Sequence, residues 1–396
     1  MTRIMRLFAY GFLSVTLALY LAQVGLSEKQ IGLLFTLTLL GDAVITLSIT
    51  TSADRIGRRR MLILGAALMA LAGLVFSLTK NPVLLMVAAI VGVISPSGNE
   101  IGPFLSIEQA SLSQLVGDRR RTHVFAWYNL VGAFATATGA LCGGTLAHAL
   151  QSAGFAPVDS YRVLMIAYAL SGAALGVVFL GLSPAVETHA VMTVHGANRL
   201  FGLRDSRRAV FKLSSLFALD AFGGGFIVQS LMAYWFHLKF GAGVGALGLI
   251  FFGANILAGV SALLAARIAA RIGLINTMVF THLPSNVLLC LVPLMPNLHL
   301  AIAVLLLRYS ISQMDVPTRQ SYTMAVVSPD ERSAASGVTT IARSVGASLS
   351  PALSGQLLAN PLLLNTPFLL AGGLKIIYDL LVYRGFRHVR PPEETG

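Results

Sequence analysis

Long apolar runs separated by short polar segments constrain this chain more than any other feature. Their approximate bounds are 6–25, 30–50, 61–79, 82–114, 124–149, 161–182, 213–236, 244–266, 274–295, 298–327, 334–358 and 362–383. A helix crosses the hydrocarbon core of a bilayer with about 20 apolar residues. Only 11% of the 396 residues are charged, against about 25% in a soluble domain. The runs therefore predict an all-α integral membrane protein with twelve transmembrane helices.

The polar segment 51–60 indicates the orientation. It contains Arg55, Arg58, Arg59 and Arg60, and each arginine at the centre of a membrane helix costs about 2.5–3.5 kcal/mol. Short loops rich in arginine stay cytoplasmic. If the N-terminus is cytoplasmic, the cytoplasmic segments hold 20 of the 28 Lys and Arg residues and the external loops hold 3. We therefore expect a multi-pass protein of the cell (cytoplasmic or inner) membrane with both termini cytoplasmic.

The two halves of the chain repeat at a shift of 211 residues. Gln109 then coincides with Gln320 and Arg121 with Arg332. The small residues of the fifth and eleventh runs also coincide, and small residues let helices approach closely in lipid. We expect pseudo-symmetric six-helix halves at 1–182 and 213–396, the second with a short cytoplasmic tail, joined by a basic cytoplasmic linker at 183–212. Duplicated halves imply a site at their interface and alternating access.

Three segments resemble the major facilitator superfamily, and the resemblance covers the whole chain. Residues 50–59 resemble its signature between helices two and three, with Thr50 where glycine is usual, and 329–337 resemble the matching loop before helix eleven. Residues 139–144 resemble the glycine-rich signature of its drug/proton antiporter branch, with Ala140 in place of proline. The resemblance implies a transporter with a cytoplasmic latch against the other half near Arg343. The latch residues it implies are Asp54, Arg55, Gly57, Arg58 and Arg59.

The fourth run contains a stretch that is unsuited to a regular helix. Residues 95–103 include two prolines, two glycines and Glu100, and proline removes a backbone donor. Broken helices occur at membrane depth where the backbone lines a cavity. This stretch either lines the substrate and ion cavity or forms a packed kink with Glu100 paired to an arginine. In the resembling family, helices one, four, seven and ten line the cavity.

Charged residues inside the runs are costly and mark functional candidates. Glu100, followed by Asp315 and Asp220, is the expected proton carrier. Glu108 and Arg319 coincide in the repeat with opposite signs, so they either pair across the halves or pair separately within each half. Lys375 and Asp379, four residues apart, are expected to pair locally. The predicted substrate and proton pathway is Tyr10, Asn99, Glu100, Asp220, Arg308, Gln313 and Asp315. The predicted gating set adds Glu108, Arg319 and Arg343 to the latch residues.

These features predict a secondary active transporter that exports a small molecule by alternating access and is coupled to protons. Proton-coupled uptake or uniport of a small metabolite or anion stays open, as does a non-transporting membrane sensor. The sequence has no nucleotide-binding loop and no evident nucleophile–base pair, so we expect no enzyme activity. His148, His237, His282 and His299 are scattered towards the external side, so we expect no metal and no cofactor besides protons. The membrane explains the net charge of +12, so the expected partners are a small molecule and lipid, not nucleic acid. We expect a monomer.

Overall fold

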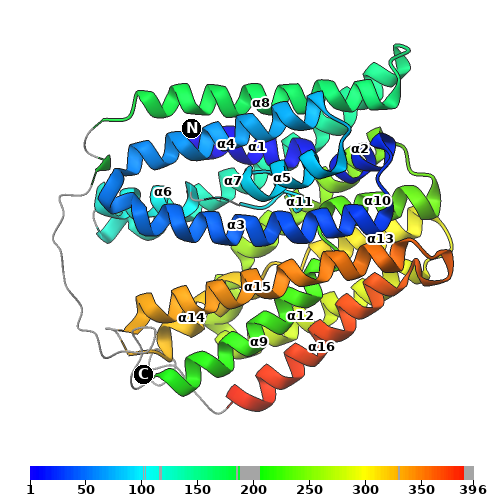
Figure 1. Cartoon of the computed structure of the whole chain (residues 1–396). Helices are drawn as coiled ribbons and strands as arrows, with labels where there is room; N and C mark the ends of the chain where they lie inside the picture. The colour runs from blue at the N-terminus through cyan, green and yellow to red at the C-terminus, as the bar shows by residue number, and fades with distance from the viewer. Residues whose placement is uncertain are drawn as a thin grey trace. The chain divides into compact units, whose positions relative to one another are not determined.

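The computed structural model describes residues 1–100, 102, 104–115, 118–183, 186–187, 206–328 and 331–387 (Figure 1). These residues form helices and connecting turns without a strand, which confirms the all-α class. The helices of the first part are α1 (Thr2–Ser14), α2 (Leu17–Val24), α3 (Glu28–Ile56), α4 (Arg58–Leu78), α5 (Pro82–Val91), α6 (Phe104–Leu115), α7 (Asp118–Ser152) and α8 (Pro157–Leu180). Those that follow are α9 (Arg207–Gly225), α10 (Gln229–Phe240), α11 (Val244–Ile272), α12 (Leu274–Leu291), α13 (Leu298–Tyr309), α14 (Asp315–Ala325), α15 (Arg332–Leu358) and α16 (Thr366–Phe386).

Several helical segments are long and apolar enough to cross a membrane. Eight pass this test among the described residues, and α1 with α2, bent by 47°, makes a ninth. The multi-pass membrane character is therefore confirmed. The shorter apolar helices α5 and α13 lie in the predicted fourth and tenth runs, and the total of twelve spans stays a prediction.

Four of the predicted runs are broken helices. The fourth breaks between α5 and α6, as its prolines and glycines predict, and the tenth breaks between α13 and α14. The first and seventh runs also break, at Val15–Thr16 and at Phe226–Val228, which the sequence analysis did not predict. The seventh break follows three consecutive glycines, at 223–225, which lower helix propensity by about 1 kcal/mol each.

The polar segment 51–60 is almost entirely helical, which corrects its assignment as a loop. Helix α3 continues to Ile56 and α4 begins at Arg58, so Gly57 alone forms the turn. Its φ of +113° is one that L side chains rarely adopt, so a glycine suits this turn. The backbone hydrogen bonds of α3 continue to its end, where Gly57 N donates to Ala53 O at 3.0 Å.

The chain divides into two compact units, and each is described by itself. One comprises Met1–Met192 with Val228–Asn255, and the other comprises Thr193–Ile227 with Ile256–Gly396. The predicted halves differ from these units mainly in placing 228–255 with the C-terminal half, and the linker residues 188–205 lie outside the described residues.

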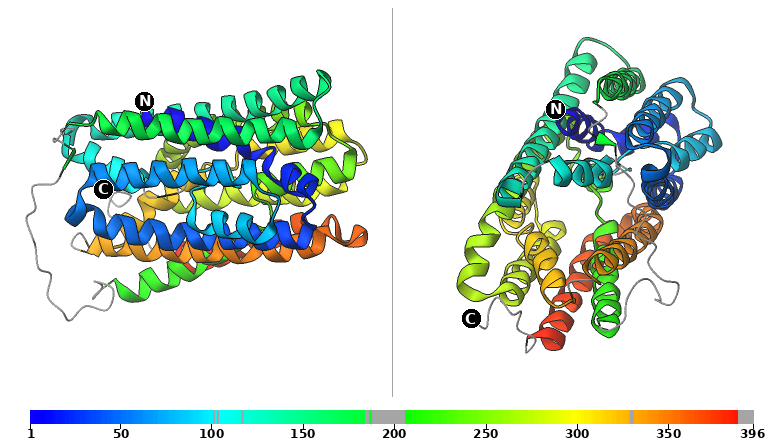
Figure 2. Two further views of the ribbon diagram at one scale, coloured as in Figure 1. Left: turned by 45° about the horizontal axis from the view of Figure 1, so that its top comes forward. Right: turned by 90° about the vertical axis from the view of Figure 1, so that its left-hand side faces the viewer.

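Helix pairing follows the same scheme inside each unit. In the first, α1 packs along α7 and α4 along α8 (Figure 1); in the second, α9 packs along α15 and α12 along α16. Figure 2 shows α9 (green) beside α16 (red) in the second unit. The paired elements correspond under the 211-residue shift, which supports the internal repeat.

Small residues bring the paired helices into backbone contact. A Cβ atom added to Gly139 or Gly143 of α7 would lie 2.1 Å from a carbonyl oxygen of α1. On α15, a Cβ added to Gly346 would lie 2.3 Å from Ala218 O of α9. The Ser350 and Ser354 hydroxyls donate to the carbonyls of Phe222 and Phe226, at 2.6 and 2.8 Å. The glycine-rich segment 139–144 therefore has a packing role in this structure.

Two glycines of α15 test this packing with opposite expected signs. Gly346→Ala forces α9 and α15 apart and should lower the free energy of unfolding by about 1–3 kcal/mol. In Gly337→Ala the added methyl group lies in open space. This substitution should raise the free energy of unfolding by up to about 1 kcal/mol, because alanine has a higher helix propensity than glycine. Thermal unfolding of both purified variants in detergent measures the two changes in stability. Shifts of the same sign would contradict the close approach of the helices.

Candidate functional site

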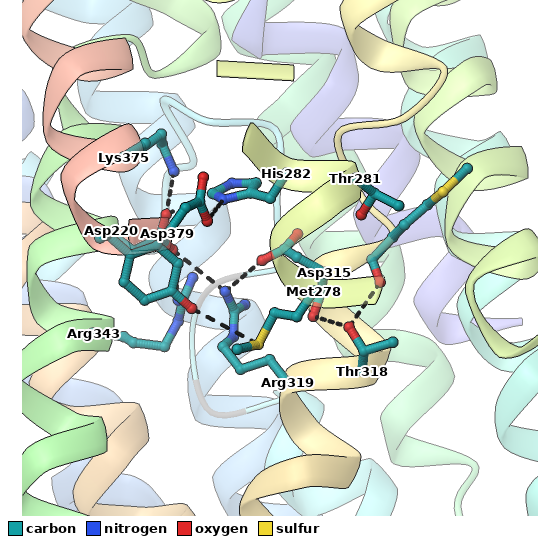
Figure 3. A network of polar contacts seen from close by, with 12 residues as sticks. Asp220, Met278, Thr281, His282, Asp315, Thr318, Arg319, Arg343, Lys375 and Asp379 are labelled. Atoms are coloured by element: carbon teal, nitrogen blue, oxygen red, sulfur yellow. Dashed lines mark hydrogen bonds and ion pairs between the residues drawn. The ribbon is translucent and has the colours of Figure 1, made fainter. Parts of the chain in front are cut away.

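A buried aspartate in the second unit organises the largest group of charges among the described residues. Asp220 lies on α9, fourteen positions into the helix from Ser206, and its side chain is 3% exposed. Its carboxylate lies close to four other elements, α12, α14, α15 and α16 (Figure 3). We call the set Asp220, His282, Asp315, Arg319, Arg343, Lys375 and Asp379 the Asp220 network.

Three permanent cations contact Asp220. Lys375 Nζ donates to Asp220 Oδ1 at 2.6 Å, whereas Arg343 and Arg319 donate to Oδ2 at 3.0 and 3.3 Å. Arg319 also donates to Asp315 Oδ2 at 2.7 Å, one turn earlier on α14. The carboxylate of Asp220 is therefore shared among cations from α14, α15 and α16.

A histidine joins a second aspartate to this group. His282 Nδ1 lies 2.8 Å from Asp379 Oδ1, and His282 Nε2 lies 3.8 Å from Asp220 Oδ1. Asn286, one turn along α12, donates to the other Asp379 oxygen at 2.9 Å. The imidazole therefore lies between two buried carboxylates and can hold a proton for either.

The Asp220 network is balanced in charge when His282 is neutral. It then has three carboxylates and three permanent cations, and a buried charge is tolerated when it is paired and hydrogen-bonded. One added proton gives the network a net charge. Its groups can therefore respond to protonation by exchanging ion-pair partners.

The first unit contains a smaller balanced group on α1, on α6 and in the break before α6. Arg6 Nε donates to Glu100 Oε1 at 2.6 Å, and Arg6 Nη1 donates to Glu108 Oε1 at 2.9 Å. Arg3 approaches the other Glu100 oxygen at 3.3 Å. Glu108 also accepts from the hydroxyls of Thr2 and Tyr128. We call Arg3, Arg6, Glu100 and Glu108 the Arg6 cluster.

The break in the fourth run is held by a side chain and a backbone group of other helices. Asp42 Oδ1 on α3 accepts from Gly102 N at 2.6 Å, and Ser230 N of α10 donates to Pro96 O at 3.0 Å. Glu100 is paired to arginine, as the packed-kink interpretation requires. Asn99 at the same break is exposed, whereas Tyr10 on α1 is buried with its ring 6.5 Å from that of Tyr168. Ile101 and Pro103 lie outside the described residues.

The segment of the predicted latch has a partner that was not predicted from the sequence. Glu187 accepts from the backbone N–H groups of Arg58 and Arg59 at 2.7 and 3.2 Å, at the N-terminus of α4. A carboxylate there satisfies free donors and suits the helix dipole. The Arg59 guanidinium donates to Leu180 O. The side chains of Asp54 and Arg55 lie outside what the structure describes, so the latch across the halves stays a prediction.

Three expectations about charge pairing have different outcomes. The local pair of Lys375 with Asp379 is wrong, because Lys375 reaches Asp220 and Asp379 binds His282. Glu108 and Arg319 each have partners within their own unit, as the alternative of separate pairing in each half requires. A direct pair of Glu108 with Arg319 across the halves stays a prediction. His282 was placed with the scattered external histidines, but its position eight residues into α12 brings it to Asp379.

Two further residues of the predicted pathway lie in or beside the break in the tenth run. Gln313 N donates to the Ser261 hydroxyl of α11 at 3.2 Å. Arg308, at the end of α13, stacks on the ring of Tyr309 with 4.9 Å between Cζ and the ring centroid. Among the described residues, no group of three or more His, Cys, Asp or Glu side chains is arranged to hold a metal ion.

Comparison with known proteins identifies the family. The pattern of the Major Facilitator Superfamily matches residues 1–351. The chain belongs to this superfamily. It is therefore a membrane transporter by family and not an enzyme. Its sequence is 32% identical to an uncharacterized membrane protein of Saccharomyces cerevisiae, over 96% of this chain and 91% of that protein.

Solved structures of superfamily transporters share the fold. A nucleoside transporter aligns with a TM-score of 0.76 at 14% identity, covering 98% of both chains. A bacterial homologue of the human lysosomal transporter Spinster aligns with a TM-score of 0.73 at 15% identity, over 98% of this chain and 96% of that one. A D-xylose–proton symporter aligns with a TM-score of 0.71 at 14% identity, over 97% of this chain and 95% of that one. The drug/proton antiporter branch is not confirmed by these similarities.

The Asp220 network predicts a large stability difference between two aspartates. Asp220→Asn leaves buried cations without a full counter-charge and should lower the free energy of unfolding by about 3–5 kcal/mol. Asp159→Asn removes an exposed pair with Arg162 and should change it by at most about 1 kcal/mol. Chemical denaturation in detergent compares the two, and equal effects would show that the network contributes little to the fold.

Proposed function

We propose that this superfamily member is a proton-coupled secondary transporter of a small molecule, and that the Asp220 network carries the proton. The observation that supports this most directly is the position of His282 between Asp220 and Asp379. Histidine is the side chain whose ordinary pKa, about 6.5, lies in the physiological range. A buried histidine with two carboxylate neighbours is suited to loading and releasing a proton.

The proton acts on the pairing around Asp220. A neutral imidazole has one N–H and donates to one aspartate at a time, whereas the imidazolium donates to both. A closer contact of His282 with Asp220 Oδ1 competes with Lys375, whose Nζ donates to that same oxygen at 2.6 Å in this structure. Protonation therefore weakens the ties of α9 to α16 and strengthens those to α12. This exchange between two pairings is the kind of bistable element that alternating access needs.

The Arg6 cluster offers a weaker proton site. Glu100, the first choice from sequence, has its carboxylate between Arg6 and Arg3, and the cluster contains no group that titrates near neutral pH in its ordinary state. We propose that Glu100 and Glu108 stabilise the junction of α1 with α6.

Export is part of the proposal, and it rests on the resemblance of residues 139–144 to an antiporter signature. Proton coupling itself has a precedent in the fold, since one structural neighbour is a D-xylose–proton symporter. Uptake with the proton is the alternative direction and uses the same network.

His282→Gln tests the proton carrier. Glutamine keeps hydrogen-bonding capacity but cannot be protonated, so we expect substrate-driven proton movement to fall at least about 10-fold, with substrate binding retained. The measurement uses proteoliposomes with an internal pH dye and a panel of organic anions, neutral metabolites and organic cations. The exposed His299→Gln is the matched control and should behave as wild type.

Reversing the pH gradient in the same vesicles gives the direction. Substrate that moves against the proton flow identifies an exporter, and substrate that moves with it identifies an importer. A proton signal that survives His282→Gln would move the proton site away from the Asp220 network. Flux without any proton movement would identify a uniporter and contradict proton coupling.

A further inference from the structure

Arg308 differs from three other buried cations of the described helices, Arg6, Arg319 and Lys375. Each of these three has a carboxylate partner within 3.0 Å. No hydrogen bond or ion pair to Arg308 occurs among the residues that the structure describes, although its side chain belongs to a residue only 8% exposed. Its Nε is buried without an acceptor.

The depth of Arg308 makes this lack of a partner costly. It lies ten residues after Leu298, the first residue of α13. At about 1.5 Å per residue this is about 15 Å, the middle of a hydrocarbon core about 30 Å thick. Arginine that faces lipid reaches the interface with its long side chain, but a side chain this buried and this deep cannot do so. Within the part of the chain that the structure describes, Arg308 therefore has no counter-charge at this depth.

The end of α13 does not satisfy the guanidinium. Arg308 is in the last turn, where free carbonyls are the nearest acceptors, but those of Leu306 and Arg308 accept from the backbone N–H of Ser310 and Ile311. The guanidinium instead stacks on Tyr309. Stacking uses the face of the planar group and leaves the N–H groups on its edge for a ligand.

The adjoining break in the tenth run offers further polar groups. Ser312 is buried, and its hydroxyl has no hydrogen-bond partner among the described residues. The hydrogen bond from Gln313 N to Ser261 anchors the break to α11. A second unsatisfied donor therefore lies four residues along the chain from Arg308, in a segment that is hydrogen-bonded to α11.

We propose that Arg308 binds an oxyanion, a carboxylate or phosphate group of the transported molecule, with Ser312 as an auxiliary donor. Bidentate pairing with arginine is the usual recognition of both groups. This names the substrate class of the proposed transporter and rests on that function. An anionic ligand supplies the counter-charge that the described chain does not provide, so the ligand-free protein is held in a state ready to bind it.

The test measures thermal unfolding of the purified full-length protein with defined probes. The carboxylate probes are lactate and succinate, the phosphate probes are inorganic phosphate and glycerol 3-phosphate, and the uncharged controls are succinamide and glycerol. A ligand that binds the folded state raises the unfolding midpoint in proportion to its affinity. We expect one oxyanion group, and not its uncharged counterpart, to raise the midpoint of the wild type.

Three variants assign the effect to Arg308. R308Q should weaken the apparent affinity for the stabilising anion at least about 30-fold. R308K should retain part of it, because lysine keeps the charge but not the planar fork. R162Q, which removes a partly exposed arginine paired to Asp159, should bind as wild type does. Without ligand, R308Q should be at least as stable as the wild type, since it removes an unpaired buried charge.

The outcomes separate this inference from the proposed transport function. Undiminished anion binding by R308Q overturns the assignment of Arg308 as an oxyanion site. The assignment also fails if only uncharged or cationic compounds stabilise the wild type, or if none of the probes does. Destabilisation of ligand-free R308Q also overturns it, because it would reveal a structural role. Proton-coupled flux of a non-anionic compound in proteoliposomes would leave the proposed transporter standing while this assignment fails. Absence of flux for every compound would contradict the transporter itself.

Discussion

The cost of burying charge in a low-dielectric interior governs the arrangement of this protein. A desolvated ion is tolerated only with a partner, and both charge groups meet this condition with equal numbers of permanent positive and negative side chains. The Arg6 cluster ties α1 to α6, and the Asp220 network ties α9 to α12, α14, α15 and α16. Each group joins helices that are far apart in sequence, so folding and charge neutralisation occur together.

The internal repeat places the two groups on corresponding elements with reversed signs. In the first unit the cation Arg6 is on the leading helix and the carboxylates Glu100 and Glu108 are on or before α6. In the second unit the carboxylate Asp220 is on the leading helix and the cation Arg319 is on α14. The contact between the leading helix and the sixth or fourteenth helix is therefore complementary in charge in both units. Among the described residues, the Asp220 network contains a histidine, His282, and the Arg6 cluster contains none.

Sequence patterns predicted the helical membrane class, the repeat and the break in the fourth run, because these depend on hydropathy and on local proline and glycine chemistry. They also singled out Asp220, Asp315, Arg319 and Arg343 as buried charges. The partners could not be predicted, since pairing depends on helix rotation and depth, which a list of runs does not contain. Lys375 and Asp379 illustrate this, because spacing favours a local pair and tertiary contacts supply better partners to both. His282 was missed for the same reason, as only packing of α12 on α16 brings it to Asp379.

Charge balance also gives meaning to Arg308, a buried cation without a carboxylate partner among the described residues. Arg319, Arg343 and Lys375 are already compensated, so an anion that bound them would have to displace Asp220 or Asp315 at a cost of several kcal/mol. Arg308 has no such competitor among the described residues, and its guanidinium edge is free of hydrogen bonds there. Under the proposed function, the two kinds of site would separate two tasks that a coupled transporter must perform. A balanced network is suited to sensing protons, because one added charge shifts its pairing, and an unbalanced cation is suited to binding cargo of the opposite charge.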